Sequence, residues 1–173
     1  MILLLLGLCI VLFDANLAAG NAYIGIFPDM LGYAMIFMAL KKANVSSPAH
    51  EKLAKWAKIS ILISAAVYIA ALAGIVQLLE GWLWIALDLG SFALECYVAY
   101  LIVAMMKERD PSVKGDYGKK LISFWRVSVL FGAVAFCCII SPASTMLLMG
   151  FSAVADISLL SFALKNSKRC AFI

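Results

Sequence analysis

Six ionisable residues interrupt long apolar stretches of this chain, and their types could support binding or proton chemistry. They are Asp14, Asp29, Asp88, Glu95, Arg126 and Asp156. A charge in apolar surroundings is costly unless it is paired, hydrogen-bonded or neutralised. Each of these residues therefore needs a partner, access to water or a bound ion.

The segment around Asp29 combines an acid with a helix breaker. On a helix, Gly25, Asp29 and Gly32 share one stripe, and the two glycines let another backbone come close. Pro28 removes one backbone hydrogen bond and frees the carbonyl of Ile24. A freed carbonyl beside a carboxylate is how broken helices coordinate small cations. A proline kink that only aids helix packing is the alternative interpretation.

A second polar stripe lies further along, where Asp88, Ser91 and Glu95 are spaced by three and four residues. No Lys or Arg occurs in the apolar stretches that carry Asp29 and Asp88. We therefore expect these two acids to form a candidate site for a proton, a cation or a cationic small molecule. Tyr33 and Ser91 complete that site. A protonated or hydrogen-bonded carboxyl in ordinary helix packing is the competing interpretation.

Arg126, Asp156 and Glu95 form a separate candidate group. With a helix rise of about 1.5 Å per residue, they lie roughly 9–18 Å from the basic ends of their stretches. A guanidinium is long enough to meet either carboxylate, so we predict a buried ion pair. A mobile charge is the alternative.

Composition indicates where these residues lie. Apolar residues make up 65% of the 173 residues and charged residues 14%, whereas a soluble domain is about half apolar and about a quarter charged. One small core cannot hide that much apolar surface, so lipid must be the solvent. Six stretches are long enough to span a bilayer: residues 1–18, 22–40, 59–79, 82–106, 121–141 and 143–164. The sequence therefore predicts an all-α polytopic transmembrane bundle, a single integral membrane domain over 1–173.

The basic residues lie at one end of these stretches. Thirteen of the fourteen fall in segments 41–58, 107–120 and 165–169, and the three other connections contain none. The positive-inside rule places the basic loops and the C-terminus in the cytoplasm, with six spans and the N-terminus also inside. Each of the three span pairs has a short outer connection, an acid in its second span and basic residues directly after that span. A repeat of three αα-hairpins is therefore a further hypothesis. Residues 15–20 imitate a signal-peptidase site, but Asp14 interrupts the run and we expect no cleavage.

Several function classes are disfavoured. The five cysteines form no C-x-x-C pair, and a lone His50 cannot complete a metal site with them, so we expect neither a metal nor a cofactor. No nucleophile–base pair can be built within the membrane, which argues against an enzyme. The topology explains the basic residues without nucleic acid.

Residues 24–33, Ile-Gly-Ile-Phe-Pro-Asp-Met-Leu-Gly-Tyr, resemble a segment of uncharacterised small multi-pass membrane proteins of Gram-positive bacteria. Those proteins carry a Pro-Asp-x-x-Gly-Tyr pattern early in the chain, followed by a basic loop. The resemblance implies a bacterial plasma membrane and no particular activity. In size and span number the chain is also similar to the membrane-embedded substrate-binding subunits of energy-coupling vitamin transporters, although no residue motif supports that likeness.

Two functions follow as hypotheses. The first is a small transporter or substrate-binding membrane subunit whose acidic site opens outward. The second is a non-catalytic assembly or sensory protein whose helices dock another membrane protein or a second copy of the chain. The small residues of the third apolar stretch and the basic loops motivate this second hypothesis.

Overall fold

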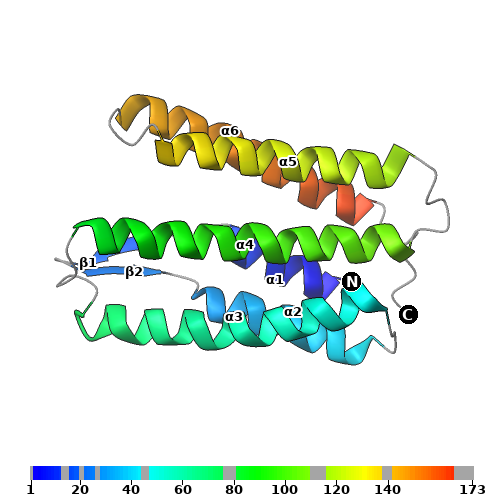
Figure 1. Ribbon diagram of the computed structural model, residues 1–173, viewed down its shortest axis with the longest axis horizontal. Helices are drawn as coiled ribbons and strands as arrows, with labels where there is room; N and C mark the ends of the chain where they lie inside the picture. The colour runs from blue at the N-terminus through cyan, green and yellow to red at the C-terminus, as the bar shows by residue number, and fades with distance from the viewer. Residues whose placement is uncertain are drawn as a thin grey trace. The chain divides into compact units, whose positions relative to one another are not determined.

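Helices form along most of the apolar stretches in the computed structural model, which describes residues 2–12, 16–19, 22–25, 28–43, 47–75, 81–109, 116–137 and 142–165. The helices are α1 (Ile2–Leu12), α2 (Asp29–Lys42), α3 (Pro48–Leu72), α4 (Gly81–Arg109), α5 (Asp116–Cys137) and α6 (Pro142–Lys165) (Figure 1). Two short strands, β1 (Asn16–Ala19) and β2 (Ala22–Gly25), form an antiparallel pair. The predicted helical fold class is therefore confirmed, with this strand pair as the exception.

Three described segments are long and apolar enough to cross a membrane: Pro48–Leu72, Ile85–Glu108 and Leu147–Lys165. They lie in α3, α4 and α6 and overlap three of the predicted spans. A chain with three such helices is a membrane protein, as its composition predicts.

The first two predicted spans are wrong as continuous helices. In place of a span over 1–18, α1 has 11 residues and is followed by β1. In place of a span over 22–40, β2 precedes an α2 of 14 residues. Neither helix reaches the roughly 17–25 residues that a single crossing requires. The two strands pair from Asn16 with Gly25 to Ala19 with Ala22, so their main-chain groups bond to each other rather than along a helix.

Pro28 explains where α2 begins. It has φ −59° and ψ 128° and stands at the N-cap, so the helix starts at Asp29 instead of kinking through the proline. Gly25 is the last residue of β2. The predicted stripe of Gly25, Asp29 and Gly32 is therefore wrong, because only the last two residues are helical.

Two local signals set the ends of α3. Ser47 accepts a hydrogen bond from the backbone N–H of His50, and Pro48 occupies the first turn, so the helix begins eleven residues before the predicted span. At the other end Gly74 has φ 73°, and Ile75 donates to the carbonyl of Ala70, which is a Schellman ending. Much of the predicted basic loop over 41–58 is thus the first turns of α3.

The chain divides into two compact units, Met1–Val98 (unit 1) and Ala99–Ile173 (unit 2). In unit 1, α2 contacts both α1 and α3, and α3 also contacts β2. The α1–α2 crossing is close because Gly7 and Gly32 face each other there. A Cβ on Gly32 would lie 2.7 Å from the Gly7 carbonyl oxygen, and a Cβ on Gly7 would lie 2.6 Å from the Gly32 carbonyl oxygen. Gly32 therefore brings a second backbone close, as the sequence suggests, and Gly7 is its partner.

In unit 2, α5 and α6 form an antiparallel pair with aromatic contacts along its length. The ring centroids of Phe124 and Phe162 are 5.8 Å apart, and those of Phe131 and Phe151 are 5.3 Å apart. Such pairs add roughly 0.5–1.5 kcal/mol beyond the area that they bury. The two helices therefore stay in contact over several turns.

Candidate functional site

Three polar side chains of unit 1 come from three helices: Asp29 from α2, Ser60 from α3 and Glu95 from α4. Asp29 is 12 residues before Lys41, and Glu95 is 12 residues before Lys107, so each acid is about 18 Å along its helix from the basic end. That distance is more than half of a hydrocarbon core about 30 Å thick. Ser60 follows Lys58, the last basic residue of α3, by two residues.

Two contacts keep these helices in register. His50 Nε2 donates to the carbonyl of Leu40 at 3.1 Å, which ties the start of α3 to the end of α2. This bond satisfies one of the carbonyls left over at a helix C-terminus. Trp56 and Tyr97 meet edge to face, with ring centroids 5.1 Å apart, which ties α3 to α4. The lone histidine thus has a structural role in the α2–α3 turn.

Tyr33 lies between the acids of α2 and α4. Its side chain is only 1% exposed, and the carboxylates of Asp29 and Glu95 are both close enough to act electrostatically on its phenol, as is Cys96. Asp29 precedes Tyr33 by one turn of α2, and Glu95 is an acid of α4 whose charge reaches the same phenol. The structure therefore brings together Asp29 and Tyr33, which the sequence predicts as site residues, and adds Glu95 to them.

Ser60 is a buried hydroxyl on α3. It is 0% exposed, and its Oγ has no hydrogen-bond partner among the described residues. It continues the buried stripe of Ala49, Leu53 and Ala57, which runs along α3. A buried hydroxyl without a protein partner costs about 1–3 kcal/mol. Such a group is expected to face a bound water or ion.

Asp88 and Ser91 take different positions. Asp88 is exposed on α4, and Ser91 is partly exposed. Asp88 is seven residues before Glu95, so it lies about 10 Å further along the helix. The acid that the structure brings to Tyr33 and Asp29 is therefore Glu95, whereas the sequence predicts Asp88.

The predicted ion pair of Arg126 with Asp156 is not formed among the described residues. Ser128 Oγ donates to Asp156 Oδ1 at 2.6 Å, and Ser152 Oγ donates to the Ser128 carbonyl at 3.2 Å. Arg126 is exposed on α5. Asp156, at 8% exposure, instead joins α5 to α6 through this serine–aspartate cluster. The third member of the predicted group, Glu95, belongs to unit 1.

Besides the Cys96 thiol, the polar groups considered in unit 1 offer oxygen atoms: two carboxylates, one phenol and one hydroxyl. Hard oxygen ligands suit a proton, a small cation or a protonated amine. No group of three or more His, Cys, Asp or Glu placed to hold a metal is found in the described part of the chain. The oxygen set therefore fits a cation of low charge.

No known protein-family model, no curated protein and no solved structure matches this chain.

The sequence does not identify Ser60, Gly7 or Ser128 as site residues, for two physical reasons. A serine in a helix commonly bonds its own backbone, as Ser158 does with the carbonyl of Val154. For a glycine in an apolar helix, the surrounding sequence does not indicate which helix packs against it. The spacing of Ser60 from the small residues Ala49 and Ala57 is the signal that could have placed it on an inward stripe.

Proposed function

We propose that this chain is a membrane protein that binds a small cation or a proton within the bilayer, as a small transporter or a membrane-embedded substrate-binding subunit of a bacterial plasma membrane. Asp29 and Glu95 supply the negative charge, and Tyr33 and Ser60 supply neutral oxygen ligands. The single observation that carries the proposal is the fully buried Ser60 hydroxyl with no partner among the described residues. In this proposal a ligand held by Asp29 and Glu95 gives the hydroxyl a hydrogen bond or coordination.

Charge supports a cationic ligand. Asp29 and Glu95 both act electrostatically on Tyr33, and nearby carboxylates stay ionised together only with a compensating positive charge. A proton, a monovalent cation or a protonated amine is a ligand of that kind.

Six crossings with both termini in the cytoplasm stay part of the proposal, and the lengths of the broken segments support them. An 11-residue α1 and a 4-residue β1 add up to about 30 Å. A 4-residue β2 and a 14-residue α2 add up to about 34 Å by the same arithmetic. Non-helical backbone is tolerated at membrane depth only where protein or water covers it, and β2 does contact α3. A helix that begins inside the membrane beside an acid is the arrangement that transporters use for ion sites.

The test is charge displacement in proteoliposomes on a solid-supported membrane, after jumps of pH, of NaCl and of methylammonium chloride. We expect Asp29→Asn and Glu95→Gln to reduce the apparent affinity for the active cation at least tenfold, because each removes a compensating carboxylate. Ser60→Ala is expected to reduce it about threefold to tenfold, the loss of one hydrogen bond or ligand.

Asp88→Asn is the matched control, since it removes an acid of the same helix that lies about two turns away from Glu95. It is expected to leave the signal unchanged. Equal signals from wild type, Asp29→Asn and Glu95→Gln for all three probes would refute the proposal. Loss of signal in Asp88→Asn alone would favour the site that the sequence predicts.

A second function, a non-catalytic assembly or sensory partner, is favoured by one observation. Asp88 is exposed on α4, next to Leu87 and Leu89, which are 41% and 51% exposed. Cysteine cross-linking from Leu89→Cys in native membranes tests for a partner there. A stoichiometric cross-linked species would support assembly, and an uncross-linked chain would count against it.

A further inference from the structure

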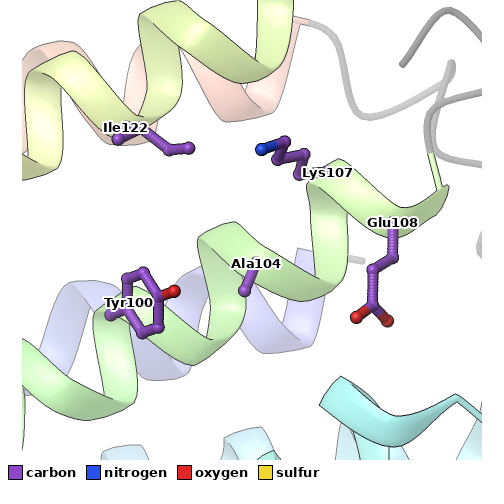
Figure 2. Close-up of a pocket in the computed structure, with 5 residues that line it drawn as sticks. All are labelled: Tyr100, Ala104, Lys107, Glu108 and Ile122. Atoms are coloured by element: carbon purple, nitrogen blue, oxygen red, sulfur yellow. The ribbon is translucent and has the colours of Figure 1, made fainter.

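A pocket of about 270 Å³ lies in unit 2 where α4 approaches its end. Tyr100, Ala104, Lys107 and Glu108 of α4 line it, together with Ile122 of α5. Figure 2 shows the Lys107 side chain reaching from α4 toward Ile122, with the Glu108 carboxylate on another side of the same helix. The pocket therefore presents one cation, one anion and one phenol around an apolar floor of Ala104 and Ile122.

Packing against α5 positions the Lys107 side chain at the edge of the pocket. A Cβ on Gly118 of α5 would lie 3.1 Å from Cγ of Lys107, so the aliphatic stem of the lysine lies against this glycine. A lysine stem that packs on apolar surface while its ammonium stays free is the usual way that this side chain bridges two environments. The Tyr100 ring is fixed by Trp125, with ring centroids 5.1 Å apart and a tilt of 49°. Two of the three polar groups are thus positioned by α5.

The pocket lies at a membrane–water boundary. The apolar segment of α4 that is long enough to cross the membrane runs from Ile85 to Glu108, so Lys107 and Glu108 are its last residues. Tyr100 is seven residues deeper, about 10 Å along the helix. Basic and aromatic side chains at this depth are those that contact lipid headgroups.

We propose that this pocket binds the headgroup of a zwitterionic aminophospholipid of the phosphatidylethanolamine type. The phosphate lies between the Lys107 ammonium and the Tyr100 hydroxyl, both of which donate hydrogen bonds to it. The Glu108 carboxylate accepts from the ethanolamine ammonium. The acyl chains leave over Ala104 and Ile122 into the bilayer.

Charge complementarity selects this headgroup over others. The pocket carries one positive and one negative side chain, which matches the net charge of zero on the headgroup. A phosphatidylglycerol headgroup offers Lys107 the same phosphate but ends in a neutral glycerol, so it presents no positive charge to Glu108. A choline headgroup has no N–H with which to donate to Glu108. The proposal does not depend on the cation site of unit 1.

The experiment is native mass spectrometry of the full-length protein, released from detergent after titration with phosphatidylethanolamine, phosphatidylcholine or phosphatidylglycerol of identical chains. Wild type is expected to bind phosphatidylethanolamine most tightly. Lys107→Gln should weaken that binding about tenfold, the usual effect of losing a charge-assisted hydrogen bond. Tyr100→Phe, which removes only the hydroxyl, should weaken it about threefold. Lys165→Gln, an exposed lysine at the end of α6, is the control and should change nothing.

Glu108→Gln tests the recognition of the ethanolamine ammonium separately from that of the phosphate. It should abolish the preference for phosphatidylethanolamine over phosphatidylcholine and raise the binding of phosphatidylglycerol, because it removes the negative charge. Glycerophosphoethanolamine, the soluble headgroup, should not displace the lipid at equal concentration, since it lacks the acyl chains. Displacement at equal concentration would overturn the lipid assignment in favour of a soluble phosphate ester. A wild type that prefers phosphatidylglycerol, or equal binding by wild type and Lys107→Gln, would overturn the headgroup assignment.

Discussion

The α1–α2 pair and the α5–α6 pair are both antiparallel helix contacts, yet they hold together by different means. In α1–α2 the backbones approach directly at Gly7 and Gly32. In α5–α6 the contact is made by side chains: the cluster of Ser128, Ser152 and Asp156 and two pairs of phenylalanines. The first pair consists of short helices connected through two strands, and the second of helices with 22 and 24 residues.

This difference shows two ways to pair helices where lipid is as apolar as the side chains. Association in a membrane relies on close van der Waals packing of small residues or on hydrogen bonds between helices. A glycine crossing leaves no room for a side chain and tolerates no added atom. A hydrogen-bonded cluster keeps its stability when a neighbouring side chain changes in volume, but loses stability when one donor or acceptor is removed. The predictions below test that contrast.

Gly32→Ala is expected to have the largest effect, a loss of about 3 kcal/mol in the free energy of unfolding, because the new Cβ overlaps a backbone oxygen that cannot move aside. Gly150→Ala is the matched control, since a Cβ there meets nothing within 4 Å. It should stabilise the protein by about 0.5–1 kcal/mol, the usual gain of alanine over glycine inside a helix. Steric trapping in bicelles measures both. Equal effects from the two substitutions would show that the close crossing is not what pairs α1 with α2.

Ser128→Ala is expected to cost about 1–2 kcal/mol, because it leaves the Asp156 carboxyl of the serine–aspartate cluster without its donor. Ser158→Ala removes only a hydrogen bond within one helix, from Ser158 to the carbonyl of Val154, and should cost less than about 0.5 kcal/mol. Asp156→Asn keeps an oxygen acceptor and should lie between the two. The same unfolding assay ranks the three variants. A cost for Ser158→Ala as large as that for Ser128→Ala would contradict the role of the cluster.

Phe151→Leu is expected to have the smallest effect, about 1 kcal/mol, since it keeps an apolar side chain and loses the ring stacking with Phe131. Leu130→Ala on the neighbouring helix is the comparison. Leu130 is 60% exposed and should change stability by less than about 0.5 kcal/mol. Both values come from the same unfolding measurement. A larger cost for Leu130→Ala would mean that this face of α5 is covered by another polypeptide.

Several properties of the chain were determined by local sequence. Residence in a membrane follows from the apolar segments in α3, α4 and α6, because transfer into lipid depends on the residues of one segment taken alone. The interruption before Asp29 follows from Pro28, which lacks the N–H that a continuous helix needs. The separation of acids from basic residues along the chain is also visible in the sequence, and it identified Asp29 and Tyr33 as residues of interest.

The tertiary structure decided which residues meet. The sequence predicted continuous helices at 1–18 and 22–40, but hydropathy does not distinguish an apolar helix from an apolar strand pair, whose hydrogen bonds come from a partner segment. Gly7 faces Gly32, and Glu95 rather than Asp88 acts on Tyr33, because the rotation and level of packed helices set these contacts. Those two quantities depend on residues far apart in the chain, so no local pattern contains them.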